Sequence, residues 1–458
     1  MIPSPPTKSY WDASAALRAI VGENARLVEM GKRAAHEVAP LAAEADRNPP
    51  RLVPPNRIEY HPSYRAMEEI AYGSGMVCDK YAPSPVASPS PLAMKNAGAP
   101  LTHSQAFGLG YLFAMAEMGL YCPVCMTDGV ARVLDRRGLR SDIVTRLGAR
   151  DAATRWTGAM FVTEKAGGSD VGANETIARN GRLTGLKWFC SNVDAQAVLV
   201  TARSEGASAG TKGLRTYLLL PRGNPGFQIE RLKDKLGVRS MPTGEVRLTD
   251  APAEEIGGFD AMLEMMNFSR LYNAVASVAI IGRAIYEARS YIEQRMAFGK
   301  RVIEHPLAAA TLAELESKHL GALLMTFETI RALERADAGD EDSARLHRIL
   351  VPIVKAFTGK LAVACVSEAM EMIGGNAYVD DSPLPRMLRD AQVLPIWEGT
   401  TNILCLDALR VARKEGTHEL LARDVALPEE RDARKWAFQL AETFQRRLVE
   451  EFRVRSKI

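Results

Sequence analysis

The sequence predicts a mainly α-helical protein with a central β domain, and two observations support this. Apolar residues recur every three or four positions before residue 155 and after residue 258, which is the spacing of amphipathic helices. Between these regions, short runs rich in β-branched and aromatic residues alternate with Gly, Pro, Ser and Asn, as strands and turns do. The chain has 458 residues, 47% of them hydrophobic and 25% charged, so we expect two or three domains.

The first region, residues 1–155, is expected to form an N-terminal helical domain. Its stretch "DASAALRAIVGENARLVEMGKRAAHEV" places apolar residues three or four apart and contains few β-branched runs. The next region, residues 156–257, is expected to form a middle β domain. Here "QAVLVTAR", "LRTYLLLPR", "FQIERL" and "GEVRLTD" read as short strands separated by turn residues.

The helical spacing returns over residues 258–413, where long amphipathic segments joined by short turns predict an antiparallel four-helix bundle. The last stretch, residues 414–458, is expected to be a short charged helical tail. Its basic residues alternate with acidic ones, a pattern more typical of a solvated helix than of a binding surface.

Composition and charge exclude few classes of protein, and the sequence favours a cytoplasmic location. A net charge of +3 gives no general electrostatic reason to expect nucleic acid. The N-terminus lacks the pattern of a secretory signal, and no window holds about 18 uninterrupted apolar residues, so we expect a cytoplasmic protein without a membrane span. Cys122 and Cys125 form a CxxC pair without a second pair or a nearby histidine cluster, so we expect packing and no metal site.

Two motifs of the β region could bind a ligand. In "FVTEKAGGSDVG", Gly167 and Gly168 let backbone amides approach a ligand, and Thr163 and Ser169 offer hydroxyl groups; a plain hairpin loop explains the segment equally well. In "LKWFCSN", two aromatic side chains precede a hydroxyl group. They are either core residues before a turn or a surface on which a planar ring lies.

Three further motifs lie in the helical C-terminal region. In "EQRMAFGKRVIEHPL", Arg295 and Arg301 could bind phosphates or could be ordinary cations at a helix C-terminus. In "EMIGGNAYVDD", two glycines end a helix. In "PIWEGTTNI", Glu398 follows two large apolar residues, a costly place for an unpaired charge, so a structural carboxylate and a functional base are both open.

Taken together and in this order, the five motifs resemble those of the acyl-CoA dehydrogenase family. "VTEKAGGSD" resembles the first signature of the family and "RDAQVLPIWEGTTNI" its catalytic one, and the resemblance extends to about Arg413. Segments such as "NPPRLV", "LYCPVCMT" and "IWEGTTNILCLDALRV" resemble the AidB-like branch most. The family fold consists of an N-terminal helical domain, a middle β-barrel-like domain and a C-terminal four-helix bundle.

The resemblance implies FAD as cofactor, bound between the β domain and the bundle of a homotetramer that is a dimer of dimers, with a neighbouring subunit contributing to the site. Phe189 stands where the family usually has tryptophan, and Ser191 where it has threonine. The residues that the resemblance assigns to the cofactor are Thr163, Ser169, Phe189, Ser191, Arg295, Phe298, Gly375, Thr400 and Asn402.

The resemblance also implies the reaction, an acyl-CoA dehydrogenation that gives a 2,3-enoyl-CoA. Glu398 matches the base that removes the α-proton of the thioester while flavin N5 accepts a hydride from the β-carbon. Some members carry the base on a bundle helix, but Ser269 stands at that position, so Glu398 is the candidate. A free glutamate has a pKa of about 4.3, and desolvation by Ile396 and Trp397 is expected to raise it. Substrate-binding residues are predicted to be Arg270, Trp397 and Gly399.

The electron acceptor is predicted to be an electron-transfer flavoprotein or another acceptor. Arg270 has a second reading, a structural ion pair, because buried arginines commonly pair with acids. Two other functions stay open. One is an AidB-like, alkylation-response flavoprotein associated with DNA, which the short, charge-balanced tail disfavours. The other is a regulator that keeps the fold and binds acyl-CoA without turnover, which the presence of Glu398 disfavours.

Overall fold

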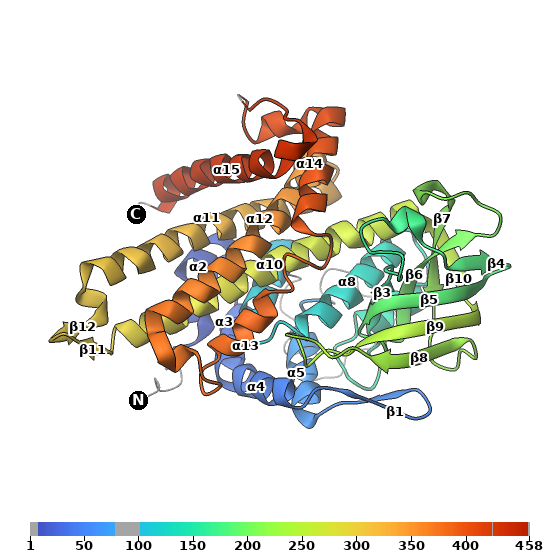
Figure 1. Cartoon of the computed structure of the whole chain (residues 1–458), viewed down its shortest axis with the longest axis horizontal. Coiled ribbons are helices and arrows are strands. Elements are labelled where there is room, and N and C mark those ends of the chain that lie inside the picture. The colour runs from blue at the N-terminus through green and yellow to red at the C-terminus, as the bar shows by residue number, and fades with distance from the viewer. Residues whose placement is uncertain (1–7, 78–100, 424, 457–458) are drawn as a thin grey trace. The chain divides into compact units, whose positions relative to one another are not determined.

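The structure, a computed structural model, describes residues 8–77, 101–423 and 425–456 (Figure 1). The chain forms two compact units. The first comprises residues 1–43, 103–118 and 270–458, and the second comprises residues 44–102 and 119–269. Helix α10 (Phe259–Ile292) begins in the second unit and continues into the first.

The second unit is built on an eight-stranded sheet whose strands follow the order β10-β7-β6-β4-β5-β9-β8, with β3 paired in parallel to β6. Most neighbouring pairs are antiparallel, which suits strands joined by the short Gly- and Pro-containing turns of this region. The strands are β3 (Gly158–Phe161), β4 (Ile177–Arg179), β5 (Arg182–Ser191), β6 (Ala197–Ser204), β7 (Leu214–Leu219), β8 (Phe227–Leu232), β9 (Thr243–Pro252) and β10 (Glu254–Gly258).

The core of this unit includes Val198, Val200, Val246 and Leu248, which are fully or almost fully buried. Helix α8 packs on β3, and α5 and α9 complete the helical part; their bounds are α5 (Pro62–Gly73), α8 (Tyr121–Arg136) and α9 (Ser141–Leu147). A two-stranded hairpin, β1 (Arg51–Val53) and β2 (Arg57–Glu59), precedes them; the sequence patterns did not predict these strands.

The first unit is helical. Three helices of more than 30 residues form its centre: α10, α11 (Pro306–Asp337) and α12 (Glu341–Ile373). Helix α14 (Thr401–Glu415) packs on α12, and α13 (Leu384–Ala391) precedes it. The N-terminal helices α2 and α7 contact α11; the N-terminal elements are α1 (Tyr10–Ala13), α2 (Ala15–Val21), α3 (Ala25–Arg33), a π-helix (Ala34–Val38), α4 (Ala39–Arg47) and α7 (His103–Ala114).

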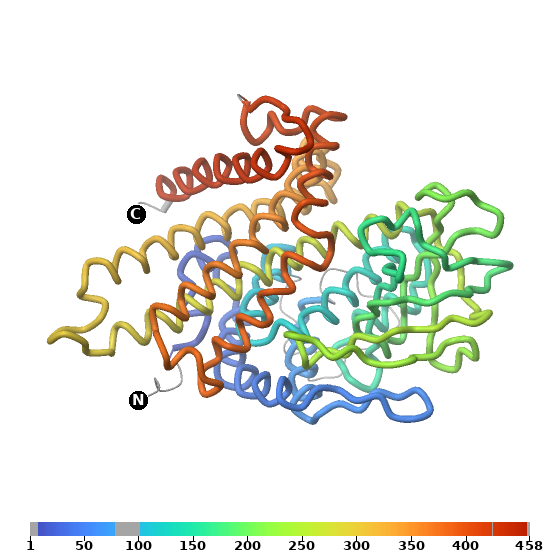
Figure 2. Tube along the Cα trace, viewed as in Figure 1, coloured from blue at the N-terminus to red at the C-terminus, as the bar shows by residue number. Residues whose placement is uncertain are grey.

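A small hairpin connects α10 to α11 at their common end, as the chain trace shows (Figure 2). It consists of β11 (Met296–Ala297) and β12 (Lys300–Arg301), with Phe298 and Gly299 both at positive φ in its turn. Phe298 is 97% exposed, so the tip presents an apolar ring to its surroundings.

The charged tail differs from the expected solvated helix. It forms α15 (Ala433–Ser456), which packs on α11 and α14. Trp436, Leu440 and Phe444 are buried in the same core as residues of α12 and α14. The charged residues occupy the other face of an amphipathic helix, so the alternation of charges hid an apolar stripe.

The predicted fold class is confirmed: a helical N-terminal region, a central β-sheet domain and a helical C-terminal region. The predicted domain boundaries stay predictions. Helix α12 is long and apolar enough to cross a membrane, but 72% of its most apolar window is buried in the unit, as in the core helix of a bundle.

Candidate active site

Glu398 lies in a sharp turn that leads into α14. Its φ is +58° and that of Gly399 is +101°, so two consecutive residues adopt left-handed or related backbone conformations. Such a conformation is rare and strained for a glutamate and easy for a glycine. Strain of this kind persists only where surrounding contacts hold it, and it clusters at functional sites.

Two cationic side chains from different helices hold this turn. Arg270 of α10 donates from Nε to the Glu398 carbonyl oxygen at 3.1 Å. Lys355 of α12 donates from Nζ to the Gly399 carbonyl oxygen at 2.6 Å. Consecutive carbonyl groups of the strained turn are therefore each fixed by a buried cation, and both cations also interact electrostatically with Glu398.

Lys355 is an unusual residue for this position because its side chain is fully buried. Desolvation lowers its pKa from 10.5 to about 7; Glu398 opposes this shift and Arg270 adds to it. A lysine with a pKa near 7 can hold or release a proton at neutral pH.

Arg270 belongs to an ion-pair network that continues away from the turn. Its Nη1 lies 3.3 Å from Asp407 Oδ2, and Arg348 and Arg410 also bind Asp407. Burial alone would raise the pKa of Asp407, but the hydrogen bond from Arg348 and the neighbouring guanidinium charges lower it below its ordinary value. Asp407 thus stays ionised and holds Arg270 in place.

The segment before the turn lies tightly against α12 and α10. A Cβ atom on Gly359 would lie 3.0 Å from the Leu394 carbonyl oxygen, so a larger residue here would push against this backbone. Asn273 Nδ2 donates to the same oxygen at 3.3 Å. The turn that bears Glu398 is therefore fixed on both sides, by side chains after it and by close backbone packing before it.

The two apolar residues before Glu398 differ in exposure. Ile396 is 60% exposed, and the desolvation of the carboxylate by this side chain stays a prediction. Trp397 is partly buried, and its indole Nε1 is buried without a hydrogen-bond partner among the described residues. Arg270 and Lys355 are charged neighbours that interact electrostatically with Glu398, a feature that the motif itself does not reveal.

A second set of predicted residues lies in the β unit. The loop after β3 folds back on itself, since a Cβ atom on Gly168 would lie 3.1 Å from Thr163 Oγ1. Glu164, 4% exposed, anchors this loop: its Oε1 accepts from Lys187 Nζ at 2.6 Å. Its Oε2 accepts from the backbone N–H groups of Glu175 and Thr176.

This buried pair lies beneath the predicted cofactor loop and joins it to β5. Burial alone would raise the pKa of Glu164, but the Lys187 ammonium and the hydrogen bonds from residues 175 and 176 hold it below its ordinary value. The backbone N–H of Trp188 also donates to the Thr163 carbonyl oxygen at 2.9 Å. The glycine-rich loop is thus fastened to the strand that bears the aromatic motif.

The aromatic motif contains a β-bulge. Lys187 pairs with Val246 but Cys190 pairs with Gly244, so β5 has one more residue than β9 across this interval. Lys233 Nζ lies 3.5 Å from the centre of the Trp188 ring and 4.8 Å from that of Phe189. Bulges commonly re-aim side chains next to functional sites.

The two rings differ in exposure. Trp188 is partly buried, whereas Phe189 is 53% exposed. Ser191 Oγ lies 3.3 Å from Thr243 Oγ1, at the end of the same strand. An exposed ring and a hydroxyl group on one strand form a surface that a planar cofactor can cover.

The remaining predicted residues belong to the first unit and do not cluster with one another. Arg295 and Phe298 are exposed at the hairpin that joins α10 and α11. Gly375 follows α12 in a short 3₁₀ helix, and Asn376 Nδ2 next to it donates to Tyr291 Oη of α10 at 3.0 Å. Thr400 and Asn402 are exposed at the N-terminus of α14, adjacent to the strained turn.

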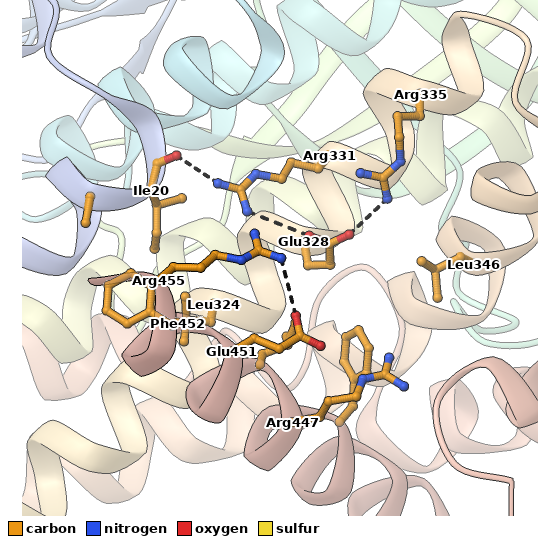
Figure 3. A pocket seen from close by; sticks show the side chains of 13 residues that line it. Ile20, Leu324, Glu328, Arg331, Arg335, Leu346, Arg447, Glu451, Phe452 and Arg455 are labelled. Carbon is orange, nitrogen blue, oxygen red and sulfur yellow. Dashed lines mark hydrogen bonds and ion pairs between the residues drawn. The ribbon is translucent and has the colours of Figure 1, made fainter. Parts of the chain in front are cut away.

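A separate hollow of about 570 Å³ lies between α2, α11, α12 and α15 (Figure 3). Its four arginines are already engaged: Arg331 with the Ile20 carbonyl oxygen and Glu328, Arg335 with Glu328, Arg447 with the Leu420 carbonyl oxygen, and Arg455 with Glu451. None of the predicted site residues lines it. Within the described ranges, no group of three or more His, Cys, Asp or Glu side chains could hold a metal ion.

The structure reveals functional candidates that the sequence patterns missed, namely Lys355, Lys233 and the Glu164–Lys187 pair. Each is a charged residue whose partner is far along the chain, so no local spacing predicts it. The one available signal was the lysine in the strongly apolar segment "ILVPIVKAF", where an unpaired charge would be costly.

Profiles of three domains match the chain in order. They are the adaptive response protein AidB N-terminal domain over residues 8–152, the acyl-CoA dehydrogenase middle domain over residues 159–251 and the acyl-CoA dehydrogenase C-terminal domain over residues 257–412.

Similar proteins agree with these profiles. Acyl-CoA dehydrogenase family member 11 of Caenorhabditis elegans is 42% identical over 327 residues, which is 66% of this chain and 53% of that protein. AidB of Escherichia coli strain K12 is 37% identical over 277 residues, 57% of this chain and 50% of that protein. The chain thus matches about half the length of these relatives.

A solved structure is similar over nearly the whole chain. The crystal structure of C. elegans ACDH-11 in complex with C11-CoA has a TM-score of 0.86 and 30% identity, with 99% of this chain and 89% of that chain covered. From the matching domains and this full-length similarity, the chain belongs to the acyl-CoA dehydrogenase family, whose members typically bind FAD, and carries an AidB-type N-terminal domain.

Proposed function

We propose that the protein is an FAD-dependent acyl-CoA dehydrogenase in which Glu398 removes the α-proton of the acyl thioester. The observation that supports this most is the strained turn at residues 398–399, held by two buried cations from two helices. A structural carboxylate needs no such backbone conformation. A base that must meet a C–H bond in one orientation needs a fixed backbone, because catalysis depends on fixed geometry.

The residues of the β unit fit FAD. The exposed Phe189 ring and the Ser191 hydroxyl group suit the face and edge of a planar heterocycle. In the adjoining loop, Gly168 leaves space beside Thr163 that a larger side chain would fill. We propose that Thr163, Ser169, Phe189 and Ser191 hold the cofactor. For the helical unit, the family resemblance assigns cofactor contacts to Arg295, Phe298, Gly375, Thr400 and Asn402, and this assignment stays a prediction. Bound FAD supplies a hydride acceptor.

The chain's own residues would divide the remaining work. Glu398 accepts the proton from the α-carbon, and the left-handed turn fixes the direction from which its carboxylate approaches. Arg270, held by Asp407, keeps the turn in place. Trp397 and Gly399, which flank the base in the sequence, are proposed to contact the substrate. Trp397 Nε1 has no hydrogen-bond partner among the described residues, and a Cβ atom on Gly399 would lie 3.1 Å from the Leu404 side chain.

We further propose that the protein works as a homotetramer, a dimer of dimers. The hairpin between α10 and α11 exposes Phe298 (97%) and Met296 (56%), with Arg295 alongside. Exposed apolar side chains at the tip of a long helical pair mark a surface for a partner. A second copy of this chain, with its own bound cofactor, is the proposed partner, and an electron-transfer flavoprotein is the proposed acceptor.

The test is direct. Purified protein should be yellow, and anaerobic addition of acyl-CoAs of increasing chain length should bleach its flavin absorbance for at least one length. ACDH-11 was crystallised with C11-CoA, so the series should extend beyond that length. A flavin that no acyl-CoA reduces would contradict the enzyme proposal and favour a protein that keeps the fold without turnover.

The DNA-associated alternative stays a prediction. The tail expected to mediate it forms α15, which buries an apolar face on α11 and α14. Arg455 is paired with Glu451 on the same helix. Salt-dependent binding of duplex DNA, weakened when exposed basic residues of α15 such as Arg446 and Arg453 are replaced by glutamine, would support this alternative.

A further inference from the structure

Lys355 is a fully buried lysine in the apolar centre of α12. Among its neighbours on the helix, Ile353, Val354 and Ala356 are buried as well. Removing an ammonium group from water is costly, and a hydrophobic side chain of similar length would fill the same volume without that cost. Its presence therefore calls for an interaction that only a cation or a strong donor can make.

The interaction is with the turn that bears Glu398. Lys355 Nζ donates to the Gly399 carbonyl oxygen at 2.6 Å, while Arg270 Nε donates to the Glu398 carbonyl oxygen at 3.1 Å. With the peptide groups on both sides of the turn fixed, the Glu398 side chain must leave the backbone in one direction. Arg270 also forms an ion pair with Asp407, whereas Lys355 reaches the turn from a different helix, α12.

We propose that Lys355 is a positioning residue for Glu398: it holds the left-handed turn from α12 and supplies a charge that favours the ionised carboxylate. This inference rests on the proposed function, because it assigns a role in the same reaction. Lys355 need not touch the substrate. It acts through the backbone of Gly399 and through its charge.

The charges around Lys355 define how the role depends on pH. Glu398 on the turn and Arg270 on α10 are the charged groups that act on it, in opposite directions. Burial brings the pKa of Lys355 to about 7. Loss of its charge as the pH rises through this range removes one stabilising cation from Glu398, and loss of the negative charge of Glu398 makes Lys355 still harder to protonate.

The first experiment compares Lys355→Met with Lys360→Met. Lys360 lies on the same helix and is exposed, so its substitution should leave the kinetics unchanged. In Lys355→Met we expect FAD to stay bound and the rate of flavin reduction by a saturating acyl-CoA to fall at least about tenfold, since small misplacement of a catalytic group is costly. The acid limb of the pH–rate profile should move upward by about one pH unit, because a cation beside the base is lost.

A fall in rate without a shift of the acid limb would overturn the electrostatic part of the proposal. An unchanged rate and profile in a folded, flavin-loaded Lys355→Met protein would overturn all of it. The wild-type protein, measured in parallel, separates the two proposals: if no acyl-CoA reduces its flavin, the proposed function fails by itself.

The second experiment needs no turnover and uses Lys355→Met only to assign a resonance. In holoprotein labelled with [ε-¹³C]lysine, the resonance of Lys355, assigned by its absence in Lys355→Met or by its burial-shifted titration, should titrate near pH 7. In Glu398→Gln its midpoint should fall, because the carboxylate that favours the ammonium form is gone. A midpoint that is the same in both proteins would contradict the coupling between Lys355 and Glu398.

Discussion

The buried pair of Glu164 and Lys187 offers a sharp test of how the predicted cofactor loop is anchored. Lys187 is fully buried and Glu164 is 4% exposed, and their 2.6 Å contact joins the loop after β3 to β5. Lys187→Met would keep the volume and leave a buried carboxylate without its cation. Breaking a buried ion pair in this way costs about 3–5 kcal/mol.

The structure places the expected cost at the lower end of that range. Glu164 keeps the backbone N–H groups of Glu175 and Thr176, at 2.6 and 3.2 Å from Oε2, and these compensate part of its charge. We therefore expect Lys187→Met to lower the free energy of unfolding by about 3 kcal/mol. The double variant Lys187→Met/Glu164→Gln, which leaves no unpaired charge, should lose less than Lys187→Met alone.

Hydrogen exchange followed by mass spectrometry can measure this locally, on peptides that cover β5 and β6. Flavin content, measured by absorbance, should fall in Lys187→Met because the loop that bears Thr163 and Ser169 loses its anchor. If Lys187→Met costs less than about 1 kcal/mol, or if the double variant is as unstable as the sum of the single variants, the pair does not anchor the loop as argued.

Three further predictions concern the helical unit. Gly359→Ala should shift the turn of Glu398 and lower the free energy of unfolding by about 1–3 kcal/mol, because the new Cβ would meet the Leu394–Pro395 backbone at 3.0 Å. Thermal unfolding checks this, with Gly73→Ala as the control, since Gly73 is a helical glycine with open space around it. Phe298→Ser should weaken self-association without unfolding the chain, a change that light scattering would detect as a smaller assembly; an unchanged mass would speak against the hairpin as a subunit contact. The pKa of Lys355 is about 7 in the folded protein and 10.5 in the unfolded chain, so the unfolded state binds more protons between these pH values. The free energy of unfolding should therefore rise with pH across this window, by up to about 5 kcal/mol. Lys355→Met should lack this rise, and a parallel pH dependence in both proteins would disprove it.

The architecture followed from the sequence because it depends on local periodicity. Helical spacing on both sides of a strand-rich segment predicted the order of helical, β and helical regions. The sequence did not predict the hairpin of β1 and β2 or the buried face of α15, because short strands and charge-rich helices give weak local patterns. Helix α15 shows the reason: Trp436, Leu440 and Phe444 recur four apart, but the charged residues before and after this stretch dominate the composition of the tail.

Site residues could be predicted from the sequence only where they stand together in one short motif. Glu398 and Gly399 stand together in one motif, so the turn could be singled out, but its positive φ values could not. Lys355 and Asp407 act through partners on other helices, and only the packing of the bundle brings them together. The shielding of Glu398 by its apolar neighbours stays a prediction. Ile396 is 60% exposed, since sequence adjacency does not decide which side of a turn a residue faces.

The central claim is that Glu398 removes a proton from a bound acyl-CoA, and Glu398→Gln tests it most directly. The measurement is the flavin absorbance during anaerobic mixing with an acyl-CoA that bleaches the wild-type protein. We expect the variant to retain FAD and to bind the acyl-CoA, while its flavin stays oxidised, since an amide cannot accept the proton. Bleaching of the flavin in Glu398→Gln at the wild-type rate would show that another group is the base and would contradict this assignment.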